Sequence, residues 1–189
     1  MTTDPSTQLP FADVTEKDWF YNDVKYVYEN GLMNGVGEGL FGPSGTTTRG
    51  MIVTILYRLE GEPSAALAAF QDVASNQWYA KAVGWAADNG IVTGYSSSQF
   101  GPNDKITREQ MAAILYRYAA YKGYDVSQRA DLSKYEDQGT ISSYAVDSMA
   151  WANGEGLING IDADTLNPKG SAIRAQVAAI LHRFCENIA

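Results

Sequence analysis

The sequence is poor in the residues from which metal sites and nucleophilic active sites are usually built. It contains one cysteine, Cys185, and one histidine, His182, in 189 residues. A single cysteine excludes an intrachain disulfide and any cysteine-based zinc site, and we interpret Cys185 as a small packing residue. With only one histidine, the sequence offers few residues from which a catalytic triad or a histidine zinc site could be built. Because the sequence has no phosphate-binding loop either, we expect no cofactor, no metal and no enzymatic activity.

Basic residues and long apolar segments are also scarce. The 14 lysines and arginines are outnumbered by 22 aspartates and glutamates, which gives a net charge of −8. This charge disfavours general attraction to nucleic acid or anionic membranes, so an anionic ligand would have to be bound by a local group of cations. No apolar run approaches the roughly 20 residues that span a bilayer, and residues 1–10 lack the segments of a secretion signal. We therefore expect neither nucleic-acid binding nor membrane insertion, and interpret the chain as cytosolic or as a piece of a longer exported protein.

One helical segment occurs in three similar copies. The copies are ITREQMAAILYRY at 106–118, TTRGMIVTILYRL at 47–59 and AIRAQVAAILHRF at 172–184. At about 100° per residue, four large apolar side chains of each copy fall on one stripe. These are Ile52, Ile55, Leu56 and Leu59; Met111, Ile114, Leu115 and Tyr118; and Val177, Ile180, Leu181 and Phe184. One such stripe buries too little surface to hold a helix alone, so we predict a three-helix bundle with the stripes facing one axis.

The copies are parts of longer repeats. Sliding the chain by 59 residues aligns 17 identical residues without a gap, and the third repeat follows at 65 to 66 residues. Each repeat predicts a first helix, at 19–30, 78–89 and 144–155, which ends at a glycine suited to a left-handed cap. We place the aromatic residues at the start of these helices, Trp19, Trp78 and Tyr144, in the core. The sequence thus predicts an all-α fold of three helix-loop-helix repeats, 11–61, 70–121 and 135–186, in one pseudo-threefold unit.

The repeat pattern closely resembles the S-layer homology domain. The second repeat carries Phe70-Gln71-Asp72-Val73 with Trp78, then Asn89 to Gly94, Phe100-Gly101-Pro102 and Ile106-Thr107-Arg108-Glu109, and the resemblance covers residues 11 to about 186. It implies an anchoring module at the cell wall or S-layer of a bacterium, outside the cell and within a longer exported protein. It also implies grooves between neighbouring repeats that hold a secondary cell wall polymer, often one whose terminal sugar carries a pyruvate ketal.

The sequence departs from the family at the start of the second helix. The four-residue T-R-A-E signature of the family ends here in Met51, Gln110 and Gln176 instead of glutamate. The third repeat also has Ile173 in place of the threonine and Leu166 in place of the loop aromatic. The match is therefore weakest around the arginine of the third repeat.

Six of the seven arginines occupy two repeated positions. The early arginines, Arg49, Arg108 and Arg174, begin the second helices, and the late arginines, Arg58, Arg117 and Arg183, follow nine residues later. Nine residues of helix turn about 900°, so the two sets point to opposite sides. An early arginine lies where the unpaired N–H groups and the positive end of the helix dipole already favour an anion. Its planar guanidinium could bind a carboxylate there through two parallel hydrogen bonds. Alternatively, it pairs with the aspartate of the Phe/Tyr-x-Asp turn and locks neighbouring units together; we interpret the late arginines as structural.

Two further columns recur in all three repeats. The aromatic column, Tyr26, Trp85 and Trp151, either fills the core or lines a groove, where a ring could pack on a sugar. The aspartate column, Asp13, Asp72 and Asp137, either tightens the turn before the first helix through backbone bonds or accepts hydrogens from a sugar.

The leading hypothesis is a monomeric, noncatalytic module that binds an acidic wall polysaccharide, with a pyruvylated terminus, in grooves between repeats. Because the second repeat matches the family best, we expect the groove at Arg108 to be the strongest. The alternative is a helical repeat scaffold for protein–protein interaction at the cell surface, in which the repeated columns only build the fold. Binding to a wall from which the polymer has been stripped would favour this alternative.

Overall fold

The computed structural model describes residues 8–189; the first seven residues, which include part of the segment examined for a secretion signal, lie outside the described range. Within it the chain forms six α-helices and two short 3₁₀ turns, Gln138–Thr140 and Ser143–Ala145, and no β-strand longer than an isolated bridge. The helices are α1 Tyr21–Glu29, α2 Arg49–Leu59, α3 Ala80–Asp88, α4 Arg108–Tyr121, α5 Val146–Gly154 and α6 Arg174–Asn187. The predicted all-α fold is confirmed, and none of the helices in this range is long and apolar enough to cross a membrane.

The second helices begin where the sequence predicted. Each starts at its early arginine, and the Oγ1 atoms of Thr48 and Thr107 accept hydrogen bonds from the N–H groups three residues later. Ile173 has no oxygen to offer, and the only side-chain bond there is from Gln176 Oε1, which accepts the Ile173 N–H at 3.2 Å. The caps therefore fix the start of α2 and α4 more fully than that of α6.

The first helices are shorter than predicted, because each begins two residues after its leading aromatic. Trp19, Trp78 and Tyr144 lie in the turn before the helix, where their exposed fractions are 63%, 59% and 52%. The prediction that these three side chains fill the core is therefore wrong. The predicted glycine stops are confirmed, with φ near +70° at Gly31 and Gly90.

A ring of backbone hydrogen bonds connects the three repeats to one another. Ile106 N–H donates to Thr47 O, Ala172 N–H donates to Ile106 O, and Thr47 N–H donates to Ala172 O. Each bond joins equivalent positions in two repeats, so the loop before each second helix pairs with the loop of both neighbours. The arrangement explains why one sequence pattern can be used three times around a common centre.

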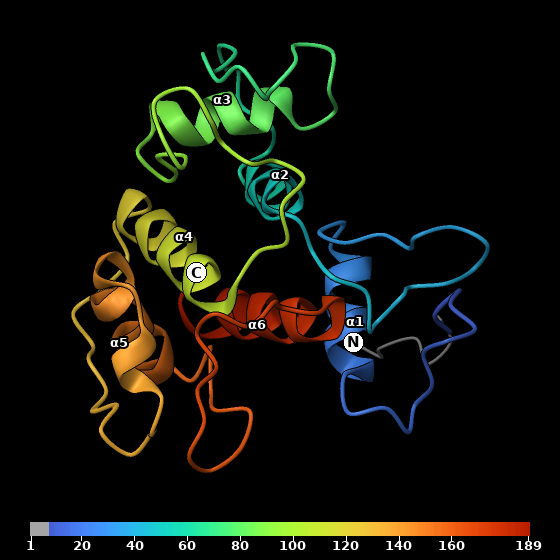
Figure 1. The fold of residues 1–189 in the computed structure, drawn as a ribbon. Helices are drawn as coiled ribbons and strands as arrows, with labels where there is room; N and C mark the ends of the chain where they lie inside the picture. Colours follow the sequence, from blue (N-terminus) through green and yellow to red (C-terminus); the bar gives the residue numbers. More distant parts are fainter. Residues whose placement is uncertain (1–7) are drawn as a thin grey trace.

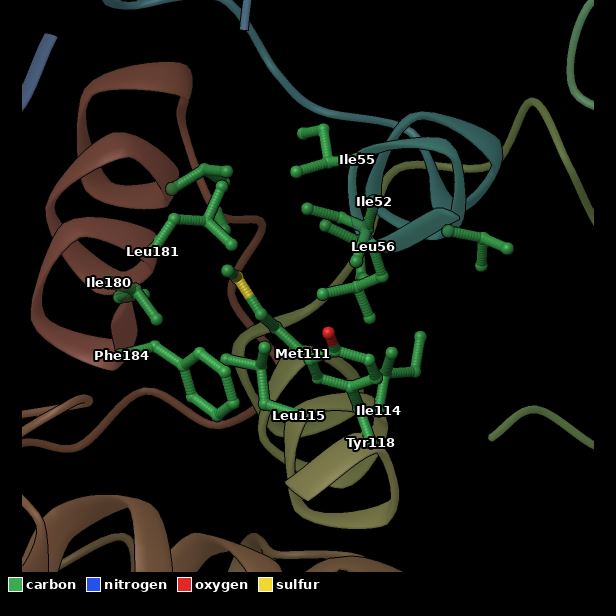
Figure 2. Close-up of a cluster of buried hydrophobic side chains, with 14 of the residues drawn as sticks. Ile52, Ile55, Leu56, Met111, Ile114, Leu115, Tyr118, Ile180, Leu181 and Phe184 are labelled. Atoms are coloured by element: carbon green, nitrogen blue, oxygen red, sulfur yellow. The ribbon is translucent and has the colours of Figure 1, made fainter. Parts of the chain in front are cut away.

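The apolar stripes of α2, α4 and α6 face that centre. Figure 2 shows side chains of Ile52, Leu56, Met111, Leu115 and Leu181 converging from the three helices, and all five are fully buried. Helices α1, α3 and α5 lie outside them (Figure 1). The predicted central group of three helices is confirmed.

The closest helix pairs are made between repeats. Helix α3 packs on α2, α5 packs on α4, and α1 packs on α6. Thus each first helix covers the second helix of the preceding repeat, and α1 closes the ring by covering the last helix of the chain (Figure 1). The first two contacts join helices linked by the chain, whereas the α1–α6 contact has no such connection.

Candidate functional site

Three hollows lie at equivalent places around the ring. Groove 1 contains Arg49, groove 2 contains Arg108 and groove 3 contains Arg174, with volumes of about 550, 240 and 170 Å³. Each is lined by an early arginine of one repeat, by the loop after the first helix of the next, by that repeat's second helix, and by an aromatic of the remaining repeat. All three repeats therefore contribute to every groove.

Two sets of side chains that we interpreted as structural line the grooves: the late arginines of the second helices, and the aromatic residues that precede the first helices. The late arginines of grooves 1, 2 and 3 are Arg117, Arg183 and Arg58, and their aromatic residues are Tyr144, Trp19 and Trp78. The recurrence of both columns was visible in the sequence. Their place beside the grooves was not predicted, because the aromatic was placed inside the helix and because nothing in one repeat indicates which groove its late arginine faces.

The early arginines are almost completely buried, with exposed fractions of 6%, 5% and 8%. Their Nε atoms donate to backbone oxygens of the next repeat: Arg49 to Phe100 at 3.0 Å, Arg108 to Leu166 at 3.0 Å and Arg174 to Phe41 at 2.9 Å. Burial lowers the pKa of all three guanidinium groups from a very high ordinary value, partly offset by nearby tyrosines and aspartates. Because the ordinary pKa of arginine lies far above 7, each guanidinium group stays charged at neutral pH. Each groove therefore has a buried cation in its wall.

The helix N-termini themselves are not available to an anion. The N–H of Arg49 donates to Asp104 O, and that of Gly50 donates to Pro102 O, both at 2.9 Å. Equivalent bonds serve α4 and α6. The predicted contribution of free helix N–H groups is therefore wrong, because loop carbonyls of the next repeat occupy them.

The aspartate column supports the loop that each arginine touches. The Asp72 carboxylate accepts hydrogen bonds from the N–H groups of Phe100 and Gly101. Asp13 and Asp137 each accept hydrogen bonds from the N–H groups of two consecutive residues that lie 28 to 30 positions later in the chain. Burial alone would raise the pKa of Asp72, but these backbone bonds and the charge of Arg49 outweigh it and lower the pKa. No early arginine forms an ion pair with an aspartate anywhere in residues 8–189. The predicted direct pair is thus wrong; arginine and aspartate meet the same loop residue from two sides.

The aromatic column lies in the core. Trp85 is 3% exposed and Trp151 is fully buried, and Tyr26 is half-buried with its ring stacked on His182 at 4.2 Å. None of the three lines a groove, and neither does any of the three aspartates. Of the nine predicted site residues, the structure brings only the early arginines to a groove.

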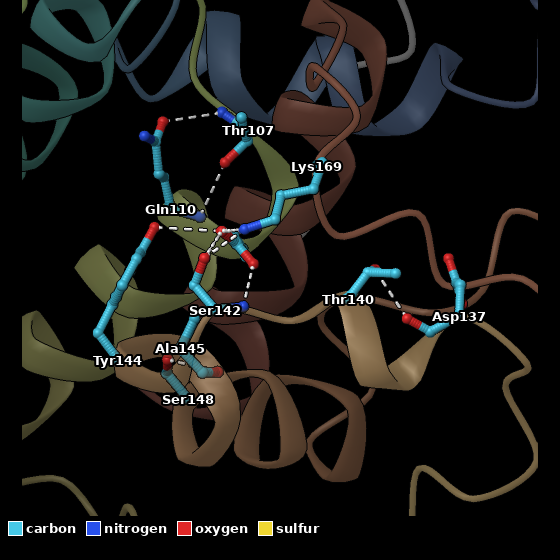
Figure 3. Close-up of polar contacts among 10 residues, drawn as sticks. Thr107, Gln110, Asp137, Thr140, Ser142, Tyr144, Ala145, Ser148 and Lys169 are labelled. Carbon is cyan, nitrogen blue, oxygen red and sulfur yellow. Dashed lines mark hydrogen bonds and ion pairs between the residues drawn. The ribbon is translucent and has the colours of Figure 1, made fainter.

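Groove 1 contains a polar network that its equivalents lack. Glu109, 3% exposed, accepts hydrogen bonds from Ser142 N–H at 2.9 Å, Ser142 Oγ at 2.8 Å and Lys169 Nζ at 2.7 Å, and a long one from the Tyr144 hydroxyl at 3.4 Å. Figure 3 shows Ser142, Tyr144 and Lys169 pointing toward one another. Gly50 occupies the position of Glu109 in the first repeat, so the network cannot form in the groove that α2 borders.

The network changes the titration of its members. Burial would raise the pKa of Glu109, but the bonds from Lys169 and Ser142 outweigh it and lower the pKa. Burial, together with the nearby Glu109 charge, raises the pKa of Tyr144 to about 12. At neutral pH the groove therefore holds an ionised glutamate and an uncharged tyrosine.

The early arginines differ in how many protein bonds they make. Arg108 Nη2 also donates to Asn159 O, and Arg174 Nη2 donates to Asn34 O. The Nη atoms of Arg49 make no hydrogen bond to any of residues 8–189; instead its guanidinium carbon lies 4.5 Å from the ring centre of Tyr95. Only in groove 1 is the outer edge of the guanidinium left without a protein acceptor in the described part of the chain.

Comparisons with known proteins agree with the repeat architecture. The family model for the S-layer homology domain matches residues 10–50, 69–112 and 134–178. An endoglucanase of Bacillus sp. (strain KSM-635) is 31% identical over 97% of the chain, and a surface-layer 125 kDa protein of Lysinibacillus sphaericus is 30% identical over 87%. A cellulosome-anchoring protein of Acetivibrio thermocellus is 25% identical over 98%.

The chain spans only 19%, 14% and 41% of the lengths of these three relatives. The shared part is thus one region of longer proteins that carry different names. What they share with this chain is the threefold repeat. The chain belongs to the S-layer homology domain family, a family of cell-surface anchoring domains.

Proposed function

We propose that this chain is a noncatalytic anchor that attaches a longer protein to the cell wall by binding an acidic polysaccharide in its grooves. The observation that carries the proposal is the concentration of cations in the grooves of an acidic protein. Arg49, Arg117 and Lys169 against Glu109 leave a charge of +2 in groove 1, and grooves 2 and 3 each have two arginines and no acid. The whole chain carries −8.

The groove chemistry suits a sugar that bears a carboxylate. A planar guanidinium can bind a carboxylate through two parallel hydrogen bonds, and an exposed aromatic ring offers a flat face to the C–H groups of a sugar. Both groups border each groove, from different repeats. The pyruvate ketal that the family resemblance suggests would supply such a carboxylate at the tip of a polymer.

Groove 1 is the best candidate for the main site. Its volume of about 550 Å³ falls within the roughly 300–1,000 Å³ of typical ligand pockets, whereas about 240 and 170 Å³ do not. Its arginine also keeps its Nη atoms free of protein acceptors within residues 8–189. We therefore place the strongest binding at Arg49, and not at Arg108 as the match to the family motif suggested.

Calorimetry with two matched glycosides tests the proposal. One glycoside carries a pyruvate ketal and the other lacks it. We expect binding of the first only, and loss of that binding in the Arg49→Ala variant but not in Arg129→Ala, which removes the one arginine outside the repeated positions. Equal binding of both glycosides would contradict recognition of the acid.

A second experiment separates polysaccharide binding from a protein scaffold. Isolated cell walls are mixed with the chain before and after chemical removal of their secondary polymer. We expect binding only before removal. Undiminished binding to stripped walls would instead support a protein or peptidoglycan partner.

A further inference from the structure

We infer that Tyr95 is the positioning residue that makes Arg49 available to a ligand, an inference that rests on the proposed function of groove 1. Tyr95 is 53% exposed, lines groove 1, and holds its ring 4.5 Å from the guanidinium carbon of Arg49. The ring of Phe100 lies 4.8 Å from the same carbon. Groove 1 is thus the groove in which two aromatic rings, one of them exposed, hold the arginine.

The other two grooves hold their arginine with a second carbonyl instead. Arg108 Nη2 donates to Asn159 O and Arg174 Nη2 donates to Asn34 O. The residue two positions after each of these asparagines, which corresponds to Tyr95, is Ile161 or Val36. A ring thus occupies this position only in the groove whose arginine lacks the carbonyl bond.

The backbone of the loop explains the exchange. Thr93 is the counterpart of Asn34 and Asn159, and the glycine after it, Gly94, has φ +75°. The corresponding Gly35 and Gly160 lie outside the left-handed region. Rotation of φ at a glycine turns the peptide group before it, which in this loop carries the Thr93 carbonyl. The turned carbonyl does not accept from Arg49, and the Tyr95 ring stabilises the guanidinium in its place.

The two ways of holding an arginine have opposite consequences for binding. A carbonyl consumes an N–H donor, whereas a ring face attracts the cation without using any donor. Arg49 therefore stays fixed in direction by its Nε bond to Phe100 O and by two rings, with both Nη groups available to a carboxylate. In Arg108 and Arg174, one of these two groups already donates a hydrogen bond to a backbone carbonyl.

Binding of a purified pyruvylated wall polysaccharide, native and after reduction of its carboxyl groups to alcohols, tests the inference. Tyr95→Ile introduces the side chain found in the second groove. We expect it to weaken binding of the native polymer roughly five- to tenfold, the scale of a partly desolvated cation–π contact, with little effect on the reduced polymer. Tyr95→Phe keeps the ring face and should bind as the unmodified chain does. The position-matched control, Val36→Ala, should leave both affinities unchanged, because Val36 is exposed and does not line the third groove.

The outcomes separate the two levels of the argument. If Arg49→Ala abolishes preference for the native polymer and Tyr95→Ile leaves it intact, the positioning role of Tyr95 is overturned while the groove stands. If Tyr95→Ile weakens the native and reduced polymers equally, the ring contacts the sugar and does not act through Arg49, which also overturns the inference. If Arg49→Ala changes nothing, the proposed function of groove 1 fails irrespective of Tyr95.

Discussion

Groove 1 and groove 3 are built on the same framework and differ at a few side chains. Groove 1 has about 550 Å³, a free guanidinium edge and the Glu109 network. Its arginine begins α2 and its lining loop follows α3, and the chain connects these two helices directly. Groove 3 has about 170 Å³, and its arginine is bonded to two carbonyls at the place where α1 closes on α6. The difference teaches that a repeated scaffold can leave the guanidinium edge free at one junction and close the ring of repeats at another.

The two helix pairs that adjoin these grooves, α2–α3 at groove 1 and α1–α6 at groove 3, differ as well. At groove 1, Tyr57 of α2 packs against the buried Trp85 of α3, with ring centres 5.7 Å apart. At groove 3 the same two positions hold His182 and Tyr26, stacked at 4.2 Å, and His182 Nδ1 lies 2.8 Å from Asp23 Oδ1. The α2–α3 junction, whose helices are linked by the chain, relies on a large buried aromatic side chain. The α1–α6 junction, which closes the ring of repeats, relies on a smaller, partly exposed pair.

The largest expected effect concerns these two junctions. Trp85→Ala should lower the free energy of unfolding by about 3 to 5 kcal/mol, because it leaves a large cavity between α2 and α3. Tyr26→Ala at the closing junction should cost about half as much or less, because Tyr26 is only half-buried. Urea denaturation followed by circular dichroism measures both. Equal losses would show that the two junctions contribute alike to the fold.

The next effect concerns the two arginines. Arg49→Ala should weaken binding of the pyruvylated polysaccharide by about 10- to 150-fold, the equivalent of roughly 1.5 to 3 kcal/mol for a charge-assisted hydrogen bond. Arg174→Ala should change binding little and mainly lower the melting temperature, because its donors already serve Phe41 and Asn34. Calorimetry and thermal unfolding of both variants check the contrast. A larger loss of affinity in Arg174→Ala would reverse the assignment of the two grooves.

A smaller effect concerns the glutamate that only groove 1 contains. Because the pKa of Glu109 is lowered in the folded state, its ionised form stabilises the protein at pH values above the ordinary glutamate pKa of about 4.3. This contribution is lost as the pH falls through the lower folded value, and each unit of lowering corresponds to about 1.4 kcal/mol.

The Glu109→Gln variant isolates this contribution. Its free energy of unfolding should lie below that of the unmodified chain at pH 7, and the gap should narrow as the pH falls below about 4. Glu16→Gln, at an exposed glutamate, serves as the control and should show no such gap. A gap for Glu109→Gln that stays constant from pH 7 to pH 3 would contradict the role of the ionised carboxylate.

The smallest effect concerns the aromatic at the mouth of groove 1. Tyr144→Phe removes only a 3.4 Å hydrogen bond to Glu109 and should change polysaccharide affinity by about threefold or less. Tyr144→Ala also removes the exposed ring face and should weaken binding more. Calorimetry on the pair distinguishes the hydroxyl from the ring. If both variants bind as the unmodified chain does, Tyr144 lies outside the site.

Much of the fold could be predicted from the repeats, whereas the composition of the grooves could not. The recurring stripes predicted α2, α4 and α6 and their central arrangement, because apolar periodicity is a local signal. A repeat read by itself does not tell which neighbour its side chains meet. The sequence therefore suggests that Leu166 affects the arginine of its own repeat, Arg174. In the structure, however, the Leu166 carbonyl accepts a hydrogen bond from Arg108 of the second repeat.

The error over the leading aromatics has a related cause. Trp19 and Trp78 precede helices whose first turns could not be located to within two residues from sequence, and a shift of two positions moves a side chain to the opposite part of the helix surface. Large aromatics are usually buried, which favoured the core. The exposed position becomes clear only when the neighbouring repeat is in place to form the groove.

A crystal structure of the chain with the pyruvate-ketal glycoside bound tests the central claim most directly. The account predicts density for the carboxylate against the Nη atoms of Arg49, with the sugar in groove 1 near Tyr144. Density for the ligand away from all three early arginines would contradict it.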